Sequence, residues 1–188
     1  MEMEKQPERI VSDSGFEIEV VRRDEGYFHV RVSRANVIEL ILSAKQRCGK
    51  NILQLISAVD RIEEDIFQLT WILEDTADSS VFIVSADYPR KNCSVPTLGD
   101  IWPTAVIFER ELHEMYGIEF PGNPRQNEDF LLEGWKELPP MRRDFDTLEY
   151  SIRTYGERRE RTHTDPRKYI AEITGEWDTP VPMKDEDR

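Results

Sequence analysis

The densest cluster of side chains that could do chemistry lies near the middle of the chain. Glu109, Glu111, His113 and Glu114 fall within six residues of one another. Carboxylates beside a histidine are the residue types used in general acid–base catalysis and in metal binding. His113 and Glu114 begin an HExxH pattern, but Gly117 stands where the second histidine ligand would be. The two-histidine geometry of a zinc protease is therefore broken, and a metal-dependent hydrolase using Glu111, His113 and Glu114 stays open only as an alternative.

The same residues have a second interpretation as the charged face of a helix. Arg110 and Glu114 are four residues apart, as are Glu109 and His113. Each pair can therefore meet on one side of an α-helix. Such a face makes ion pairs within the chain or with a partner protein. This interpretation needs no active site, but it needs a helix whose opposite side is buried.

Apolar residues predict the helix that positions the cluster. Between residues 101 and 115 they recur at spacings of four, three, four and three, which is the period of an amphipathic helix. Asp100 is suited to the N-cap, and Pro103 is tolerated in a first turn. Gly117 is typical of a helix end. The sequence therefore predicts a helix over residues 100–116.

The first half of the chain predicts the sheet on which this helix would pack. Segments with alternating apolar residues, or rich in β-branched and aromatic residues, predict strands over residues 16–20, 27–32, 51–60, 66–74 and 81–87. A second helix is predicted between Asn36, its N-cap, and Gly49 at its end. Because these strands are apolar enough to need cover, the sequence predicts an α+β domain of two layers.

The predicted organisation has three parts. Residues 1–15 are expected to be a mobile arm, residues 16–120 the α+β domain, and residues 121–188 an extended partner-docking segment and tail. Several prolines interrupt the start of this last part. After residue 146 no sustained apolar period is present beyond a short helix suggested near residues 169–173. A tail that carries aromatic residues but cannot bury them is expected to lie along another protein.

Composition argues against several classes of function. The chain has 38 acidic and 25 basic side chains, a net charge of −13, so a nucleic-acid partner is not expected. Two cysteines, Cys48 and Cys93, cannot supply a four-thiolate metal or cluster site. No window approaches the roughly 18 consecutive apolar residues of a membrane span. Phosphate-binding glycine loops and GxSxG and CxxC motifs are not found in the sequence.

Three motifs, in order and spacing, resemble one family. They read LISAVD at residues 55–60, DIWPTA followed by ERELHEMYGIEF at residues 100–105 and 109–120, and PMRRDF at residues 140–145. Together they resemble the signature of the C-type subunit of respiratory complex I, the smaller hydrophilic subunit that lies beside the D-type subunit. The segment after the second motif departs from the common pattern. This departure and a thermophile-like composition favour an archaeal relative of the standard NADH:quinone oxidoreductase.

The resemblance implies a fold and a set of partners. Members have a two-layer α+β fold with a mixed sheet and carry no redox centre. They pack against the D-type homologue, which is related to the hydrogenase large subunit, and beside other cluster-bearing peripheral subunits. Iron–sulfur clusters, and a nickel–iron centre or quinone, would then belong to neighbouring subunits. The chain itself would be a peripheral subunit at the cytoplasmic face of the cell membrane, in an NADH dehydrogenase, hydrogenase, sulfane reductase or deazaflavin-linked complex.

The family motifs and the tail together predict the residues of a partner interface. As an alternative to a subunit of a membrane complex, the chain would be a free-standing acidic adaptor that binds soluble proteins. The expected interface residues are Asp60, Asp100, Trp102, Glu109, Arg110, Glu111, Glu114, Tyr116, Gly117, Arg142, Arg143, Asp144, Phe145, Tyr150, Tyr155, Tyr169 and Trp177.

Overall fold

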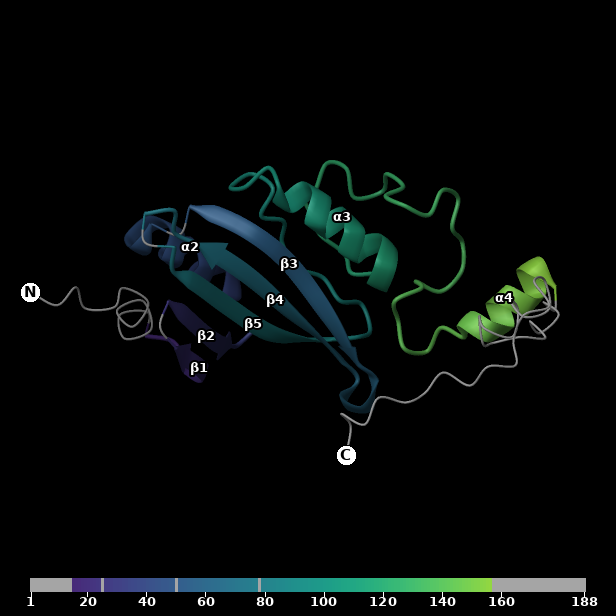
Figure 1. Cartoon of the computed structure of the whole chain (residues 1–188), viewed down its shortest axis with the longest axis horizontal. Coiled ribbons are helices and arrows are strands. Elements are labelled where there is room, and N and C mark those ends of the chain that lie inside the picture. The colour runs from purple at the N-terminus through teal and green to yellow at the C-terminus, as the bar shows by residue number, and fades with distance from the viewer. Residues whose placement is uncertain (1–14, 25, 50, 78, 157–188) are drawn as a thin grey trace, which may run out of the picture. The chain divides into compact units, whose positions relative to one another are not determined.

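The computed structural model describes residues 15–24, 26–49, 51–77 and 79–156 (Figure 1). The chain divides into two compact units, Met1–Asp146 and Thr147–Arg188. The first unit contains the sheet and its covering helices. The predicted arm at residues 1–15 lies almost wholly outside the described residues, and so does the helix suggested near residues 169–173.

Five strands of the first unit form one mixed sheet. They are β1 (Ile18–Asp24), β2 (Tyr27–Val32), β3 (Ile52–Arg61), β4 (Ile66–Glu74) and β5 (Val81–Pro89). Their order across the sheet is β1-β2-β5-β4-β3. The central β2–β5 pair is parallel, and the other pairs are antiparallel. The predicted strands and the mixed sheet are confirmed.

Two helices cover one face of this sheet. Along β4, residues Phe67, Leu69, Trp71 and Leu73 are buried and alternate with partly exposed residues, as expected for a strand with one covered face. The buried residues of α2 (Val37–Cys48) and α3 (Ala105–Tyr116) join them in one core. The two-layer α+β prediction is confirmed.

Helix α3 begins five residues later than predicted. Before it, residues 98–102 form turns in which Ile101 and Trp102 donate backbone hydrogen bonds to the carbonyl of Leu98. Trp102 is buried, and its indole Nε1 donates to the Asn51 carbonyl at 2.8 Å. Pro103 disfavours helical geometry in the residue before it. Asp100 is therefore an exposed turn residue, and Thr104 takes the N-cap position.

The end of α3 agrees with the prediction. Gly117 adopts the left-handed conformation, with φ 75°, and its N–H bonds the His113 carbonyl. Ile118 and Phe120 then enter the core, and Glu119 bridges to Ser94. From Pro121 to Asp146 the structure describes every residue and contains no helix or strand.

Helix α4 (Thr147–Tyr155) belongs to the second unit and was not predicted. Leu148, Ile152 and Tyr155 recur at helical spacing but are all exposed. The prediction of a tail without regular structure missed them because three apolar residues among charged ones are a weak periodic signal.

Among the described residues, no helix has the length and apolar character needed to cross a membrane.

Gly117 provides a test of how closely the chain after α3 is packed. A Cβ added at Gly117 would lie 3.3 Å from Pro139 Cγ, whereas one added at Gly134, with φ 70°, would meet nothing within 4 Å. Both Gly→Ala substitutions impose left-handed strain of roughly 1–2 kcal/mol. We expect Gly117→Ala to lower the free energy of unfolding further than Gly134→Ala, as measured by denaturant titration. Equal losses would show that Pro139 does not press on the helix end.

Candidate partner-binding site

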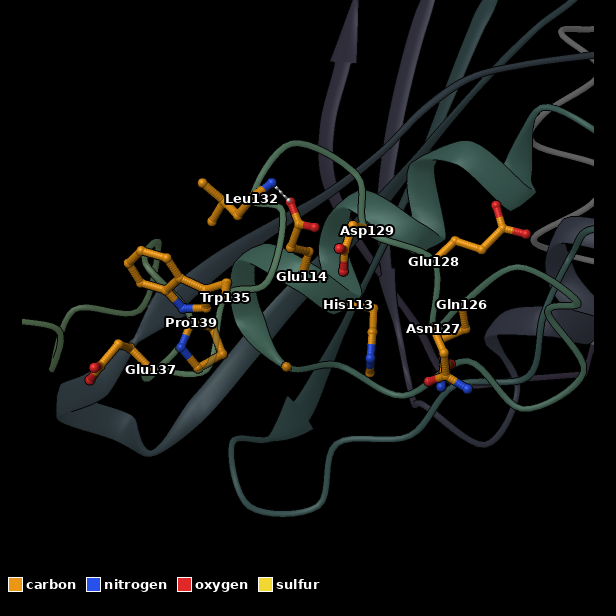
Figure 2. A pocket seen from close by; sticks show the side chains of 11 residues that line it. His113, Glu114, Gln126, Asn127, Glu128, Asp129, Leu132, Trp135, Glu137 and Pro139 are labelled. Atoms are coloured by element: carbon orange, nitrogen blue, oxygen red, sulfur yellow. Dashed lines mark hydrogen bonds between the residues drawn. The ribbon is translucent and has the colours of Figure 1, made fainter.

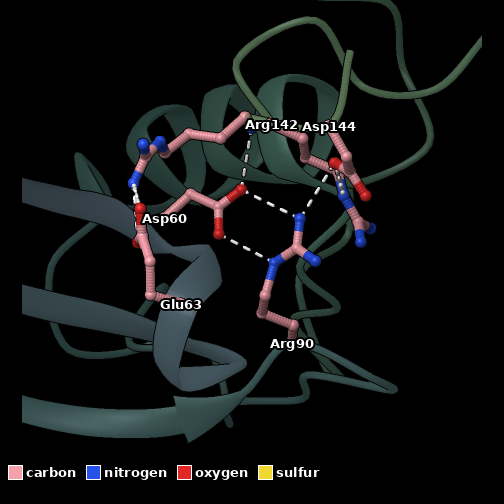
Figure 3. A network of polar contacts seen from close by, with 6 residues as sticks. Asp60, Glu63, Arg90, Arg142 and Asp144 are labelled. Carbon is pink, nitrogen blue, oxygen red and sulfur yellow. Dashed lines mark hydrogen bonds and ion pairs between the residues drawn. The ribbon is translucent and has the colours of Figure 1, made fainter.

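A buried ion pair joins the ends of two strands. Asp60, at the end of β3, and Arg90, just after β5, have side chains only 2% and 9% exposed. Arg90 Nε donates to Asp60 Oδ1 at 2.7 Å, and its terminal nitrogen donates to Oδ2 at 3.0 Å (Figure 3). This forked geometry is the strongest arrangement available to a guanidinium and a carboxylate. The hydrogen bonds to Asp60 raise the pKa of Arg90 above its ordinary value.

The PMRRDF segment is attached to this pair. The backbone N–H of Arg143 donates to Asp60 Oδ2 at 2.9 Å, and Arg90 also donates to Asp144 Oδ1 at 2.9 Å. Burial opposes ionisation of Asp144, but a backbone hydrogen bond and the charges of Arg142 and Arg90 outweigh it and lower the pKa of its carboxyl. The first and third family motifs therefore meet at one buried carboxylate, although 83 residues separate Asp60 from Arg143.

An aromatic ring completes this junction. The guanidinium carbons of Arg90 and Arg142 lie 5.7 and 5.6 Å from the centre of the Phe67 ring. Tyr116, at the end of α3, meets the same ring edge-on at 5.8 Å. Both arginines are within the range of a cation–π interaction. Phe145, the last residue of the PMRRDF segment, packs against Trp135 with their ring centroids 5.6 Å apart.

Glu109 is buried, and its carboxylate links α3 to the segments on either side of it. It is 1% exposed and accepts hydrogen bonds from Thr97 Oγ1 at 2.6 Å, the Leu98 N–H at 2.7 Å and Asn123 Nδ2 at 2.9 Å. These donors precede and follow α3 in the sequence, so one carboxylate joins both flanks to the helix. Burial raises the pKa of Glu109, and the hydrogen bonds oppose this rise only in part.

Glu114 and Arg110 hold a later loop in the same way. Glu114 accepts backbone hydrogen bonds from Phe130, Leu131 and Leu132 at 2.6, 2.8 and 3.1 Å. The guanidinium of Arg110 lies 5.2 Å from the Phe130 ring centre and 3.5 Å from Glu128. Glu114, one of the residues that could have done chemistry, and its helix neighbour Arg110 thus fix residues 128–132 against α3.

A cavity of about 300 Å³ lies between α3 and this loop (Figure 2). His113 and Glu114 line it, but Glu111 does not. His113 Nδ1 lies 2.9 Å from the Ile118 carbonyl, and the Glu114 carboxylate is occupied by the three amides. Within the described ranges, no group of three His, Cys, Asp or Glu side chains could hold a metal ion. The three residues of the alternative hydrolase site are therefore not brought together in this cavity.

The structure divides the predicted interface residues into groups. One group meets at the junction around the buried ion pair and consists of Asp60, Tyr116, Arg142, Arg143 and Asp144. A second group contributes to the packing of α3 and consists of Trp102, Glu109 and Gly117. Glu111 is partly exposed on α3. Tyr150 and Tyr155 are on α4 in the second unit, and Tyr169 and Trp177 lie outside the described residues.

Sequence reasoning missed two partners of these residues. Arg90 was not singled out, although a carboxylate that ends an apolar strand needs a cation nearby when it is buried. Asn123 was also missed, because an amide in a proline-rich stretch gives no periodic signal.

The central ion pair yields a prediction with an internal control. Asp60→Ala leaves Arg90 with Asp144 alone and removes the acceptor of the Arg143 amide. Because breaking a buried pair leaves an uncompensated charge, we expect a loss of roughly 3 kcal/mol in the free energy of unfolding. Glu63→Ala removes the exposed ion pair with Arg143 and should change stability little. Similar losses in both variants, measured by denaturant titration, would refute the central role of Asp60.

The raised pKa of Glu109 predicts that the free energy of unfolding depends on pH. Its pKa is raised in the folded protein above the ordinary value of 4.5, so the folded state holds this proton longer than the unfolded state. The contribution of Glu109 to stability is therefore present in acid and declines as pH rises from 4.5 through the folded pKa. We expect the unfolding free energy of wild type minus that of Glu109→Gln to fall as pH rises over this interval, because only the glutamate loses its proton. A signed difference that rises with pH would contradict the assignment.

The comparisons with known proteins agree with this architecture. The model of the family "Respiratory-chain NADH dehydrogenase, 30 Kd subunit" matches residues 30–151. The C-type subunit of the NADH-quinone oxidoreductase of Ruegeria sp. (strain TM1040) is 30% identical over 176 residues, which cover 86% of this chain and 85% of the relative. The C/D subunit of the same enzyme from Phocaeicola vulgatus is 30% identical over 118 residues, which cover 62% of this chain and 22% of that one.

A solved structure shares the fold. A chain of the membrane-bound sulfane sulfur reductase, an archaeal respiratory membrane complex, superposes with a TM-score of 0.73 at 24% identity, covering 83% of this chain and 92% of that chain. The family match spans more than half of the sequence and includes all three motifs. The chain therefore belongs to the family of the 30 kDa subunit of respiratory-chain NADH dehydrogenase, the C-type subunit family of complex I.

Proposed function

We propose that this chain is a non-catalytic peripheral subunit of a membrane-bound, ion-translocating oxidoreductase of the complex I and energy-converting hydrogenase superfamily. It packs against the D-type homologue, which resembles a hydrogenase large subunit. In this role the chain supplies shape and position to the assembly. The redox chemistry belongs to its neighbours.

One observation carries the proposal. Three charged residues of the family motifs, Asp60, Glu114 and Asp144, are engaged within the chain, where they hold parts of residues 121–146 against the sheet and α3 without any helix or strand. Ordering an irregular segment costs conformational entropy, and here the contacts within the chain offset that cost. A segment with a fixed shape lowers the cost of binding a partner, because less order remains to be imposed.

The identity of the partner is supported by a fused relative. The Phocaeicola vulgatus protein carries the double designation C/D, and the part similar to this chain is 22% of its length. Two subunits joined in one polypeptide work in the same assembly. This supports the D-type homologue as the neighbour of the present chain, through the docking segment and the tail that begins with α4.

Neighbouring subunits supply the redox groups in this proposal. Iron–sulfur clusters, and a nickel–iron centre or quinone, would be held by those subunits. The chain would lie at the cytoplasmic face of the membrane as part of the peripheral arm. The parent complex is either a quinone-reducing dehydrogenase or one of its hydrogenase or sulfane reductase relatives, and co-purifying subunits would distinguish them.

Arg110 and Arg125 form a matched pair for testing the proposal, because both contact Glu128. Arg110 is largely buried against Phe130, whereas Arg125 is exposed. We expect Arg110→Ala to reduce the amount of assembled membrane complex while the turnover of each assembled complex stays unchanged. Arg125→Ala should affect neither. Assembly is measured by native electrophoresis of detergent-solubilised membranes that carry the tagged full-length chain.

Two outcomes would contradict the proposal. Normal assembly with abolished turnover in Arg110→Ala would indicate a direct chemical role for the α3 cluster. Recovery of the wild-type chain only in the soluble fraction, without a D-type homologue, would favour the acidic adaptor.

A further inference from the structure

Leu131 combines high exposure with a fixed backbone. The residue is 71% exposed, more than any other large apolar residue among the described residues. A single exposed leucine is ordinary on a protein surface. What distinguishes Leu131 is that hydrogen bonds hold the backbone of its loop in place.

Glu114 fixes the backbone that carries Leu131. Its two carboxylate oxygens accept the N–H groups of Phe130, Leu131 and Leu132 at 2.6, 2.8 and 3.1 Å. Three successive amides thus converge on one carboxylate of α3, as Figure 2 shows for Glu114 and Leu132. Hydrogen bonds to a charged acceptor are stronger than those between neutral groups.

Further contacts hold both sides of the loop. Arg110 covers the Phe130 ring at 5.2 Å, and Asp129 Oδ2 accepts the Gly134 N–H at 3.2 Å. The backbone on either side of Leu131 is therefore tied down while its side chain projects into solvent. A side chain presented in this way loses less entropy on binding than one on a loose loop.

The charges around Leu131 describe the surface that it fits. Residues 128–134 contain three carboxylates and no basic side chain, and Glu128 is paired with Arg110 and Arg125 from outside this stretch. Two of them, Asp129 and Glu133, stand two residues before and after Leu131, and both are exposed. An apolar centre with a polar rim is the usual anatomy of a protein–protein interface. An acidic rim is complementary to a basic one.

We propose that Leu131 is an anchor of the interface between this chain and the D-type homologue. It enters an apolar pocket of the neighbouring protein whose rim carries arginine or lysine side chains. Glu114 is its positioning residue, because it fixes the loop through the amides of residues 130–132. This inference rests on the proposed function and identifies which part of the docking segment makes the contact.

The test uses the tagged full-length chain in membranes that contain the whole complex. Leu131→Asp should lower the amount of chain retained in the purified complex on the order of tenfold, since burying a leucine contributes at least one factor of ten in affinity. Leu131→Met keeps an apolar side chain and should stay within about twofold of wild type. Val20→Asp, at an exposed apolar position of β1 outside the three motifs, is the control and should also stay within about twofold.

A second readout separates positioning from simple stability. Glu114→Ala should accelerate amide hydrogen exchange at residues 130–132 in the isolated chain and weaken retention although Leu131 is present. The unfolding midpoint of Leu131→Asp should equal that of wild type, because the side chain is exposed. Retention of Leu131→Asp at the wild-type level would overturn the anchor while leaving the proposed function intact.

A photo-crosslinking residue at position 131 identifies the pocket. We expect a crosslink to the D-type homologue at an apolar site flanked by arginine or lysine. A crosslink to such a site on another protein of the complex would keep the anchor and overturn the choice of partner. The absence of any crosslink in the assembled complex would overturn the anchor. A wild-type chain that never enters a complex would instead refute the proposed function, and this inference with it.

Discussion

The buried pair of Asp60 and Arg90 sets the position of the chain that follows α3. Taking both charges out of water is costly, and only their forked contact and the added bonds to Arg143 and Asp144 offset that cost. What the pair contributes is therefore position more than stability. It joins the ends of β3 and β5 to a segment far away in the sequence, and that segment has no helix or strand to hold its own shape.

The charged residues of the family motifs hold neighbouring segments of the chain in position. A cluster of Glu, Arg and His on a helix has the composition of an active site, yet its members perform different structural tasks. Glu109 joins the two flanks of α3, and Glu114 fixes the amides of residues 130–132. Charged groups engaged in this way fix the loops on either side of α3 in position.

Much of this fold could be predicted from the sequence. The five strands and two helices of the first unit follow from local signals, since β4 is rich in β-branched and aromatic residues and the apolar residues of α3 recur at spacings of three and four. The start of α3 could not be predicted, because the burial of Trp102 and its bond to Asn51 depend on residues far away. Arg90 and Asn123 were missed for the same reason: their importance lies in contacts across the fold, which leave no periodic trace.

The central claim is that residues 121–146 are held in place before any partner binds. The most direct measurement is the rate of amide hydrogen exchange at Arg143 in the isolated full-length chain, because this N–H bonds the buried Asp60 carboxylate. We expect slow exchange there in the free chain, close to that of the β3 core. Rapid exchange in the free chain, slowed only within the assembled complex, would contradict the claim.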